Sequence, residues 1–439
     1  MLIEHTAAFC YDCGYSHKAD LIVRDNQIVA IVRCPKGDHE YNISSNAAMF
    51  LEFRDRSFTN ITGKVMHKLR YVLNYIPITN ACNFDCTICG ADAKHDKEEV
   101  FFLSVDEIFQ RALQAKRDKG YMINLTGGEP TLHPDLLDIV RRISGIGISL
   151  GINTNGYLLG KDKHLASSLK QYGLSRVIIQ FDSFDEDVLR QLGRNYLPEK
   201  RKAIENAIGA GLRVGLNSIV TKGNLPEIGR LLAHGLDLGP AVMNIAFASP
   251  APTGRYLINR SEAVDREQMV SQLLEVGDHY HFSFDDFLPL PTCIPWGIQV
   301  HPDCGVHIIF VRTPHLISPL NRYIDMKKLY NSLSRVPHRA NIVNKYFLTF
   351  MYLIRSVRKD RWLDSLKIAL GLFFAKRRYS VVNVGLSNYD AAEFLDEQRI
   401  GRCAAAFYTP EGPVKGCLFA FLDLQSSDSP KHRAARGTF

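Results

Sequence analysis

Three cysteines in the stretch Cys82-Asn-Phe-Asp-Cys86-Thr-Ile-Cys89 are the residues best placed to do chemistry. Their spacing lets three thiolates ligate three irons of a [4Fe–4S] cluster, and it leaves the fourth iron without a protein ligand. A zinc knuckle is the alternative. Zinc sites usually close with a fourth Cys or His nearby, and the only candidate, His95, follows a charged run. The spacing therefore predicts an iron–sulfur cluster with one open iron.

Short apolar runs alternate with helical segments on either side of this motif, from Lys64 to about Gly254. This alternation predicts parallel βαβ units, and six such units fit an incomplete (β/α)6 barrel. Reactive side chains in such barrels lie at the carboxyl ends of the strands. A capping box at Ser104 and Glu107 predicts the start of one of the helices. The expected strands are Tyr71–Thr79, Met122–Leu125, Gly147–Ile152, Arg176–Phe181, Arg213–Ile219 and Val242–Ala246.

Polar residues gather at the expected strand ends. The segment Thr126-Gly-Gly-Glu-Pro130 follows the second strand, and its glycines let the backbone approach a ligand closely. Single Asn or Asp residues at strand ends are more often turn formers. A succession of them at one rim favours a binding site instead. The candidate cofactor-binding residues are Thr126, Gly127, Gly128, Glu129, Asn153, Asn155, Gln180, Asp182 and Asn217.

Residues 1–50 have the pattern of a small metal knuckle. Cys10 and Cys13 form a CxxC turn, a short hairpin is expected around Asp25-Asn26, and Cys34 brings back a third thiolate. A tetrahedral zinc or iron site needs a fourth ligand, and His39 is the nearest candidate, although a lone His in a polar loop is more often exposed. A closed site has no position for substrate, so a structural role is expected for it.

Four further cysteines lie outside the expected barrel. Cys293, Cys304, Cys403 and Cys417 are enough to ligate one more [4Fe–4S] cluster. The alternative is that two or more of them are plain buried thiols, which are common. We expect an auxiliary cluster.

Two apolar segments, 342–357 and 362–374, carry large side chains at helical spacing and are flanked by basic residues such as Arg358, Lys359 and Arg361. Such helices can lie on an anionic membrane surface or line an apolar substrate tunnel. An apolar stripe is also what an ordinary core helix shows. Both interpretations stay open at this point.

The cysteine motif, together with Gly127-Gly128-Glu129-Pro130, resembles the radical S-adenosylmethionine (SAM) superfamily. Further segments, including the N-terminal CxxC and Gly401-Arg-Cys403, are similar to the group that contains archaeal tetraether synthase and a methyltransferase acting on 6-hydroxymethyl-dihydropterin. The similarity covers about residues 5–420. This chain departs from the group in the spacing between Cys34 and His39, and it lacks a cysteine near Val384-Gly-Leu-Ser387.

The resemblance implies a [4Fe–4S] cluster on Cys82, Cys86 and Cys89 that binds SAM through its open iron. It implies reductive cleavage of SAM to a 5′-deoxyadenosyl radical, with an electron donor such as ferredoxin or flavodoxin. It also implies that the strand-end rim contacts SAM and substrate. The expected fold is α/β, a partial (β/α)6 barrel with an N-terminal metal knuckle and a C-terminal domain of auxiliary cluster and helices.

Composition sets the remaining limits. The chain has 439 residues, 46% of them hydrophobic and 23% charged, which is typical of a globular protein. A net charge of +7 does not indicate nucleic-acid binding, and no apolar run approaches the roughly 20 residues that span a bilayer. Ten cysteines without a secretory signal favour a reduced cytoplasmic location and metal ligation. The expected parts are the knuckle (1–50), the radical SAM core (64–260), a C-terminal domain (281–425) and a disordered tail (426–439).

The leading hypothesis is a radical SAM enzyme that abstracts hydrogen from an unactivated C–H bond, for C–C coupling or methylation of a lipid chain, with peripheral membrane contact. The alternative keeps the radical chemistry but acts on a pterin-like small molecule or a peptide. A third class, a non-catalytic iron–sulfur or zinc scaffold, is excluded if the protein releases 5′-deoxyadenosine from SAM. The residues that would distinguish the substrates lie in 287–417.

Overall fold

The computed structural model describes residues 1–10, 15–57, 71, 73–93, 100–120, 122–250, 264–289, 302–333, 342–375, 378–387, 394–396, 403, 405–410 and 412–416. Several sequence predictions fall outside these ranges. They concern Cys13, Cys293, Cys417, the candidate ligand His95 and the tail 426–439.

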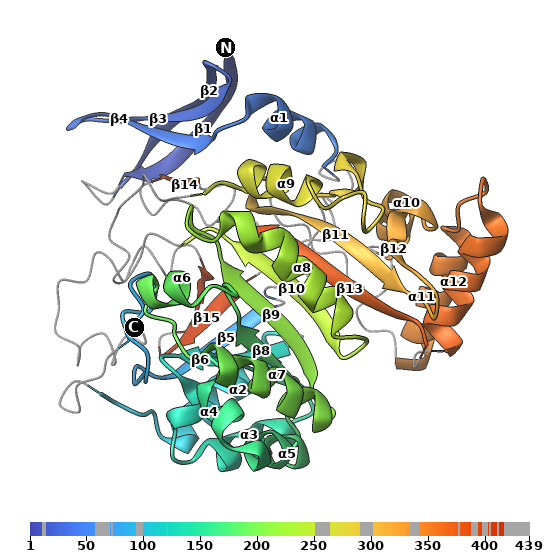
Figure 1. Ribbon diagram of the computed structural model, residues 1–439. Helices are drawn as coiled ribbons and strands as arrows, with labels where there is room; N and C mark the ends of the chain where they lie inside the picture. Colours follow the sequence, from blue (N-terminus) through green and yellow to red (C-terminus); the bar gives the residue numbers. More distant parts are fainter. Residues whose placement is uncertain are drawn as a thin grey trace.

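A mixed sheet of eleven strands forms the centre of the described structure, in the order β12-β11-β13-β10-β9-β8-β7-β6-β5-β15-β16. Its middle is a run of six parallel strands that follow one another in sequence, as expected for a βα barrel (Figure 1). These strands are β5 (Leu73–Thr79), β6 (Met122–Gly127), β7 (Ser149–Thr154), β8 (Arg176–Gln180), β9 (Arg213–Ile219) and β10 (Val242–Ala248). The predicted positions of all six strands and the α/β fold class are confirmed.

Helices cover one face of this sheet because every second strand residue is apolar and faces them. Leu125, Ile152, Ile179, Leu216 and Ile245 from five neighbouring strands belong to one buried cluster with residues of the flanking helices. The predicted capping box at Ser104 and Glu107 opens the first of these helices. The helices are α2 (Val105–Arg117), α3 (Leu136–Gly145), α4 (Tyr157–Lys161), α5 (Lys163–Gln171), α6 (Glu186–Gln191), α7 (Leu197–Gly209), α8 (Ile228–Asp237) and α9 (Arg266–Leu274).

The C-terminal third of the chain contributes strands to the same sheet, which the sequence did not predict. β13 (Ser380–Ser387) pairs parallel to β10, and β11 (Gly305–Arg312) pairs antiparallel to β13. At the other edge β15 (Ala405–Thr409) runs parallel to β5. The remaining edge strands are β12 (Ile317–Pro319) and β16 (Gly412–Lys415). The barrel wall is therefore completed by chain from beyond residue 300.

The N-terminal region forms a second sheet of five strands, larger than the predicted knuckle, at one end of the molecule (Figure 1). Asp25 and Asn26 both have positive φ, 49° and 59°, which suits the tight hairpin predicted between β2 and β3. A short strand from the far C-terminal region, β14 (Phe394–Asp396), pairs with β1. The other elements are β1 (Leu2–Cys10), β2 (Ser16–Arg24), β3 (Gln27–Cys34), β4 (Gly37–Ser44) and α1 (Ala47–Asp55).

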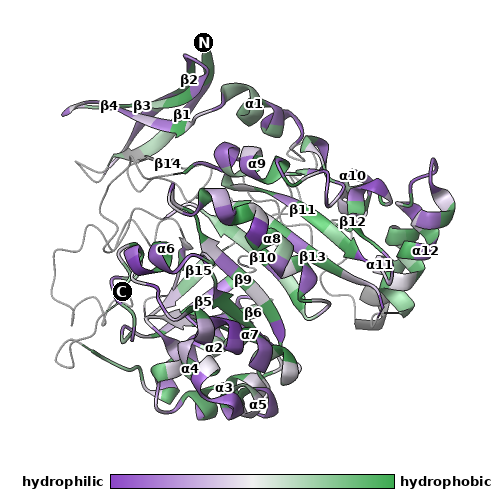
Figure 2. Cartoon of the chain, in the orientation of Figure 1, coloured by the Kyte–Doolittle hydropathy of each residue, from purple (hydrophilic) through white to green (hydrophobic). Residues whose placement is uncertain are grey.

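Three helices form a smaller layer at the opposite side of the molecule: α10 (Met326–Leu333), α11 (Ile342–Arg355) and α12 (Trp362–Phe374). Figure 2 shows much of α11 and α12 in the hydrophobic colour. Leu353, Ile368 and Ala369 pack with residues of β11 and α10 in a separate buried cluster. None of the helices in the described ranges is long and apolar enough to cross a membrane.

Candidate functional site

The cysteine loop begins where β5 ends, and hydrogen bonds hold its first residues. The Thr79 hydroxyl donates to the Phe101 carbonyl (2.6 Å) and accepts from the Ala81 amide (2.9 Å). The Asn80 side-chain oxygen accepts from the Phe101 amide (2.9 Å). Both Thr79 and Asn80 are buried. Cys82 therefore starts from a fixed backbone at the carboxyl end of the sheet.

The Gly127-Gly128-Glu129 segment lies directly against this loop. The Gly128 amide donates to the Thr79 carbonyl (2.8 Å), and the Glu129 amide donates to the Ala81 carbonyl (2.6 Å). A Cβ atom would lie 2.1 Å from the Thr79 oxygen at Gly127, where φ is +125°, and 2.0 Å from the Ala81 oxygen at Gly128. The two glycines thus let β6 and the cysteine loop touch along their backbones.

Glu129 connects the same loop to the end of β7. Its carboxylate is buried and accepts from the hydroxyls of Thr131 (2.5 Å) and Thr154 (2.7 Å) and from the amides of Thr131 (3.1 Å) and Asn155 (2.7 Å). Burial raises the pKa of Glu129, although these hydrogen bonds lower it. The Asn155 amide group in turn donates to Asn83 (2.8 Å) within the cysteine loop. Hydrogen bonds of Glu129 and Asn155 therefore link the end of β6, the end of β7 and the cysteine loop.

The donor set of Cys82, Cys86 and Cys89 suits an iron–sulfur cluster. The amides of Phe84 and Ala93 each point at a sulfur, of Cys82 and Cys89 respectively, at 3.4 Å. Burial raises the pKa of Cys82 to about 12, so a thiolate there needs a bound cation. Among the described residues, only Cys10, Cys34 and His39 gather three ligand atoms within 4.8 Å. The three loop sulfurs lie further apart, as a multi-iron cluster rather than one zinc ion requires.

Two cationic side chains that the sequence analysis missed lie beneath this loop. Arg194 is buried, pairs with Asp182 (2.8 Å) and hydrogen-bonds Cys86. The Lys200 side chain is fully buried, donates to the Gln180 carbonyl (3.1 Å) and lies 5.4 Å from the centre of the Phe84 ring. Burial lowers the pKa of Lys200 to about 8. The sequence does contain a signal for Lys200, since it lies on an otherwise apolar helix face. A lysine that is buried there needs an anionic neighbour.

The face of the sheet that points away from the helices is polar. Strand pairing places Gln180, Asn217, Ala246, Gly385 and His307 in one row across β8, β9, β10, β13 and β11. The row below contains Asn153, Ile178, Gly215, Asn244 and Asn383. Most of these residues are only half-buried, unlike their helix-facing neighbours. This inner face therefore borders space in which a ligand can lie.

Two acceptor oxygens on this side of the sheet are buried without a hydrogen-bond partner, Asn153 Oδ1 and Asp182 Oδ2. A buried, unsatisfied acceptor is costly, and it indicates a missing donor. SAM carries an ammonium group and ribose hydroxyls, which are such donors. The structure thus brings Thr126 to Glu129, Asn153, Asn155, Gln180, Asp182 and Asn217 to one rim, where the half-buried Asn153 offers an acceptor that suits the predicted cofactor.

The N-terminal sheet brings Cys10, Cys34 and His39 together with their ligand atoms within 4.8 Å. Cys10 ends β1, Cys34 ends β3 and His39 lies in β4. The Lys36 amide points at the Cys34 sulfur at 3.5 Å. Two thiols and an imidazole at this spacing fit a tetrahedral metal ion that would need one more ligand.

The structure does not bring together the two described auxiliary cysteines. Cys304 precedes Gly305, which pairs with Ser387 at the carboxyl end of the parallel sheet. Cys403 precedes Ala405, which pairs with Leu73 at the amino end of β5. Gly416, next to Cys417 in sequence, approaches Cys403, because a Cβ there would lie 3.8 Å from its sulfur. The auxiliary cluster on all four cysteines stays a prediction.

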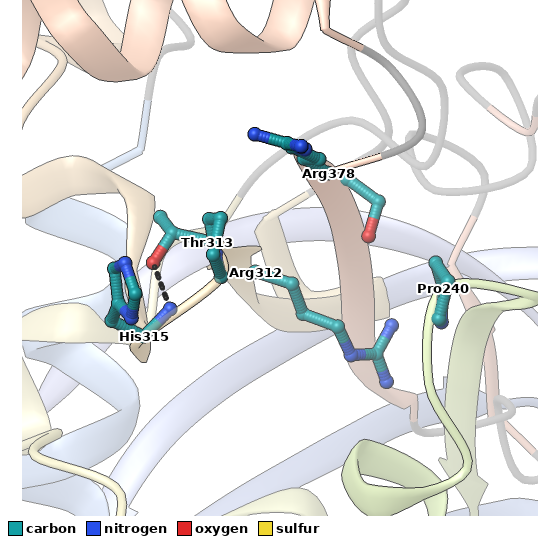
Figure 3. Close-up of a pocket in the computed structure, with 7 residues that line it drawn as sticks. Pro240, Arg312, Thr313, His315 and Arg378 are labelled. Carbon is teal, nitrogen blue, oxygen red and sulfur yellow. Dashed lines mark hydrogen bonds between the residues drawn. The ribbon is translucent and has the colours of Figure 1, made fainter.

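A pocket of about 420 Å³ lies away from this site, at the amino end of β10 and β13 (Figure 3). Its lining includes Pro240, Arg312, His315 and Arg378. The Arg312 guanidinium is occupied, because it donates to the carbonyls of Gly235, Leu236 and Val242 at 2.8 to 3.2 Å. Arg312 therefore caps the end of α8, and the pocket contains none of the predicted site residues.

Comparison with known proteins supports the assignment of the cysteine loop. Residues 76–233 match the model of the Radical SAM superfamily. The chain is 24% identical over 94% of its length to 7,8-dihydro-6-hydroxymethylpterin dimethyltransferase of Methanocaldococcus jannaschii, and it covers 92% of that protein. It is 37% identical over 172 residues to a probable GTP 3′,8-cyclase of Sulfolobus acidocaldarius. That match covers 38% of this chain and spans about half (52%) of the cyclase.

Solved structures with partial similarity include Streptococcus suis SuiB bound to S-adenosylmethionine, at 15% identity and a TM-score of 0.42, over 59% of this chain and 70% of that chain. Methylornithine synthase (PylB) matches at 16% identity and a TM-score of 0.39, over 52% of this chain and 66% of that one. The superfamily implies a [4Fe–4S] cluster and SAM. Residues 76–233, with their cysteine loop and the Gly127-Gly128-Glu129 segment, match the Radical SAM superfamily, so this part of the chain is similar to members of that superfamily.

Proposed function

We propose that this chain is a radical SAM enzyme, that it abstracts hydrogen from an unactivated C–H bond of a substrate bound on the inner face of the barrel, and that methyl transfer or C–C coupling follows. Cys82, Cys86 and Cys89 would hold a [4Fe–4S] cluster, which when reduced would supply the electron for cleavage of SAM into methionine and a 5′-deoxyadenosyl radical. The carrying observation is the pair of backbone hydrogen bonds that join the cysteine loop to Gly128 and Glu129. These bonds hold the start of the cysteine loop, at Thr79 and Ala81, against the end of β6.

Different residues of the chain would ligate the cluster, hydrogen-bond SAM and balance the charge of the thiolates. Cys82, Cys86 and Cys89 would ligate three irons. The unpaired oxygen of Asn153 would accept a hydrogen bond from the amino group or ribose of SAM. Arg194 and Lys200 would offset the negative charge of the thiolates, which is expensive to bury unpaired. An external donor such as ferredoxin or flavodoxin would supply the electron.

The inner face favours a polar small molecule as the substrate. Gln180, Asn217, Asn244, Asn383 and His307 line it, and such groups orient a ligand by hydrogen bonds. The dimethyltransferase that matches along 94% of this chain acts on a pterin, as its name says. A pterin-like heterocycle is therefore the first candidate.

A lipid chain is the second candidate, because α11 and α12 expose large apolar side chains. Phe347, Trp362, Leu363 and Phe374 are each more than half exposed. Lys359, Arg361 and Lys367 are exposed nearby. Apolar side chains bordered by basic ones suit the surface of an anionic membrane, where each cation adds roughly 1 kcal/mol. Peripheral membrane contact through this face would accompany a lipid substrate.

The experiment that tests the proposed function is anaerobic incubation of the reconstituted protein with SAM and dithionite. We expect release of 5′-deoxyadenosine and methionine in equal amounts. Addition of a deuterated pterin or of a deuterated lipid extract should transfer deuterium into 5′-deoxyadenosine for one of them. No release from protein that retains its cluster under strong reductant would overturn the proposal.

The membrane face is tested with vesicles that contain an anionic phospholipid. Changing Lys359, Arg361 and Lys367 to Gln should weaken vesicle binding by about a hundredfold, since three contributions of roughly 1 kcal/mol are removed. The matched control is a triple variant with Gln at Lys163, Lys170 and Lys202, which are exposed on α5 and α7. Equal binding of both triple variants, or no binding of the wild type, would contradict membrane contact through α11 and α12.

Lys200 is predicted to tune reduction of the cluster. Lys200→Met removes a buried positive charge beside the thiolates, and reduction adds negative charge there, so the midpoint potential should fall. We expect a shift of about 60 mV, which corresponds to roughly 1.4 kcal/mol for one electron. Redox titration followed by electron paramagnetic resonance measures it. The exposed Lys202 on the same helix is the control, and an equal potential in Lys200→Met and Lys202→Met would refute the prediction.

A further inference from the structure

Three polar side chains from β10, β13 and β11 form a hydrogen-bonded chain on the inner face. Asn383 donates through Nδ2 to Asn244 Oδ1 at 2.7 Å, and its own Oδ1 lies 3.0 Å from His307 Nδ1. His307 is 5% exposed, whereas Asn244 and Asn383 are half-buried. The cysteine motif and the rim residues do not involve these three side chains. They come from a part of the chain that lies beyond the matched residues 76–233.

The direction of these hydrogen bonds determines the state of the imidazole. In the structure Asn244 presents its Oδ1 to Asn383, which donates its NH₂ group to Asn244 and presents its oxygen to His307. That oxygen only accepts, so His307 Nδ1 carries the proton. Burial lowers the pKa of His307 to about 4, hence the ring is neutral at physiological pH. Nε2 is then a hydrogen-bond acceptor with a defined orientation.

The residues beside His307 in its row across the sheet have small side chains. The ring lies against Gly385, where a Cβ would be 3.0 Å from Nδ1. Next in the same row come Ala246, which is half-buried, and then Asn217. Asn217 and His307 are therefore three strand spacings apart, roughly 14 Å between backbones. Ala246, whose side chain is a single methyl group, thus lies between an amide on one side and an imidazole on the other.

We propose that His307, held in one tautomer by Asn383 and Asn244, determines substrate specificity by accepting a hydrogen bond from the N–H edge of a planar nitrogen heterocycle that lies over Ala246. The inference rests on the proposed function, because the same inner face would hold the substrate. It adds to that function one residue, His307, that would distinguish the substrate from its analogues. A site built to accept from an N–H group rejects an analogue that lacks it, since a buried acceptor is then left unpaired.

The test measures binding of pterin and of its 3-methyl derivative, which lacks the ring N–H, by fluorescence titration of the protein reconstituted with its cluster. We expect His307→Ala to bind pterin about tenfold more weakly than the wild type, the cost of one hydrogen bond. The 3-methyl derivative should bind wild type and His307→Ala alike. Asn383→Ala keeps the imidazole but frees its tautomer, so its affinity should lie between those of wild type and His307→Ala.

The matched control is His164→Ala, since His164 is exposed on α5, and its affinity for pterin should stay within about twofold of the wild type. Circular dichroism and iron content verify that each variant is folded and loaded. Equal pterin affinity in wild type, His307→Ala and Asn383→Ala would overturn the inference, as would a wild type that does not bind pterin. Release of 5′-deoxyadenosine by the wild type is measured separately, so failure of the proposed function is recognised on its own.

Discussion

Cys86→Ala is expected to abolish release of 5′-deoxyadenosine from SAM and to remove about four irons per chain. Cys86 is buried in the loop between two other thiols, and Arg194 hydrogen-bonds it. With only two thiolates left, the cysteine loop cannot hold a [4Fe–4S] cluster at the rim of the sheet. Iron analysis, the visible absorbance of the cluster and chromatography of the SAM cleavage products measure the effect.

The matched control for this prediction is Cys34→Ala in the N-terminal sheet. Its thiol shares a site with Cys10 and His39, within 4.8 Å. We expect this variant to lose one metal ion but to keep the cluster absorbance and the cleavage of SAM. The interpretation would be wrong if Cys86→Ala kept its full iron content, or if Cys34→Ala lost the cluster as well.

Gly128→Ala is expected to have the second-largest effect on SAM cleavage, although Gly128 supplies no ligand atom to the cluster. The new Cβ would lie 2.0 Å from the Ala81 carbonyl oxygen and 2.7 Å from that of Asn80. Both are backbone atoms of the segment that leads into Cys82, so the loop itself must move. Overpacking of this kind costs about 1–3 kcal/mol of stability. A displacement of about 1 Å at a reacting centre can lower activity by about a hundredfold.

Gly145→Ala is the control, because Gly145 ends α3 and a Cβ there meets nothing within 4 Å. We expect it to keep full SAM cleavage and to gain slightly in stability, since alanine is the better helix former. Thermal unfolding and the rate of 5′-deoxyadenosine formation are compared for both variants. A Gly128→Ala protein as active as Gly145→Ala would show that the close backbone contact does not position the loop.

The outcome for Gly128 separates two explanations of the glycine pair. The sequence suggests that these glycines allow a ligand to approach the backbone. In the structure the space that a side chain at either position would need is occupied by backbone atoms of Thr79 and Ala81, at the start of the cysteine loop. The same glycines therefore hold the start of the cysteine loop in place, as their contacts with Thr79 and Ala81 show.

Local patterns were sufficient for the six parallel strands and for the three cysteines. Alternation of apolar residues with helical segments depends on neighbours within one element, and strands β5 to β10 lie where this alternation predicts them. The rim residues from Thr126 to Asn217 could be found for the same reason, because carboxyl ends of parallel strands meet at one edge. His39 could be named as a candidate since it lies close to Cys34 in sequence.

Long-range pairing decided the rest of the site. His307 and Asn383 are 76 residues apart, and they meet only because β11 and β13 pair in one register. Nothing in the local sequence around Gly305–Arg312 predicts an imidazole beside Gly385. Arg194 and Lys200 likewise reach Cys86 and Gln180 only because α6 and α7 pack against the barrel.

The sequence by itself predicted the cofactor chemistry, because the CxxxCxxC ligand spacing and the Gly127-Gly128-Glu129-Pro130 motif are short-range features of the chain. The tertiary structure alone decided what lines the substrate face, which cations lie beneath the thiols, and that Cys304 and Cys403 lie at opposite ends of the sheet. It also decided that one side of α12 packs on a core while Trp362 and Phe374 stay exposed. These features depend on strand register and helix packing, which bring together residues that are far apart in the sequence.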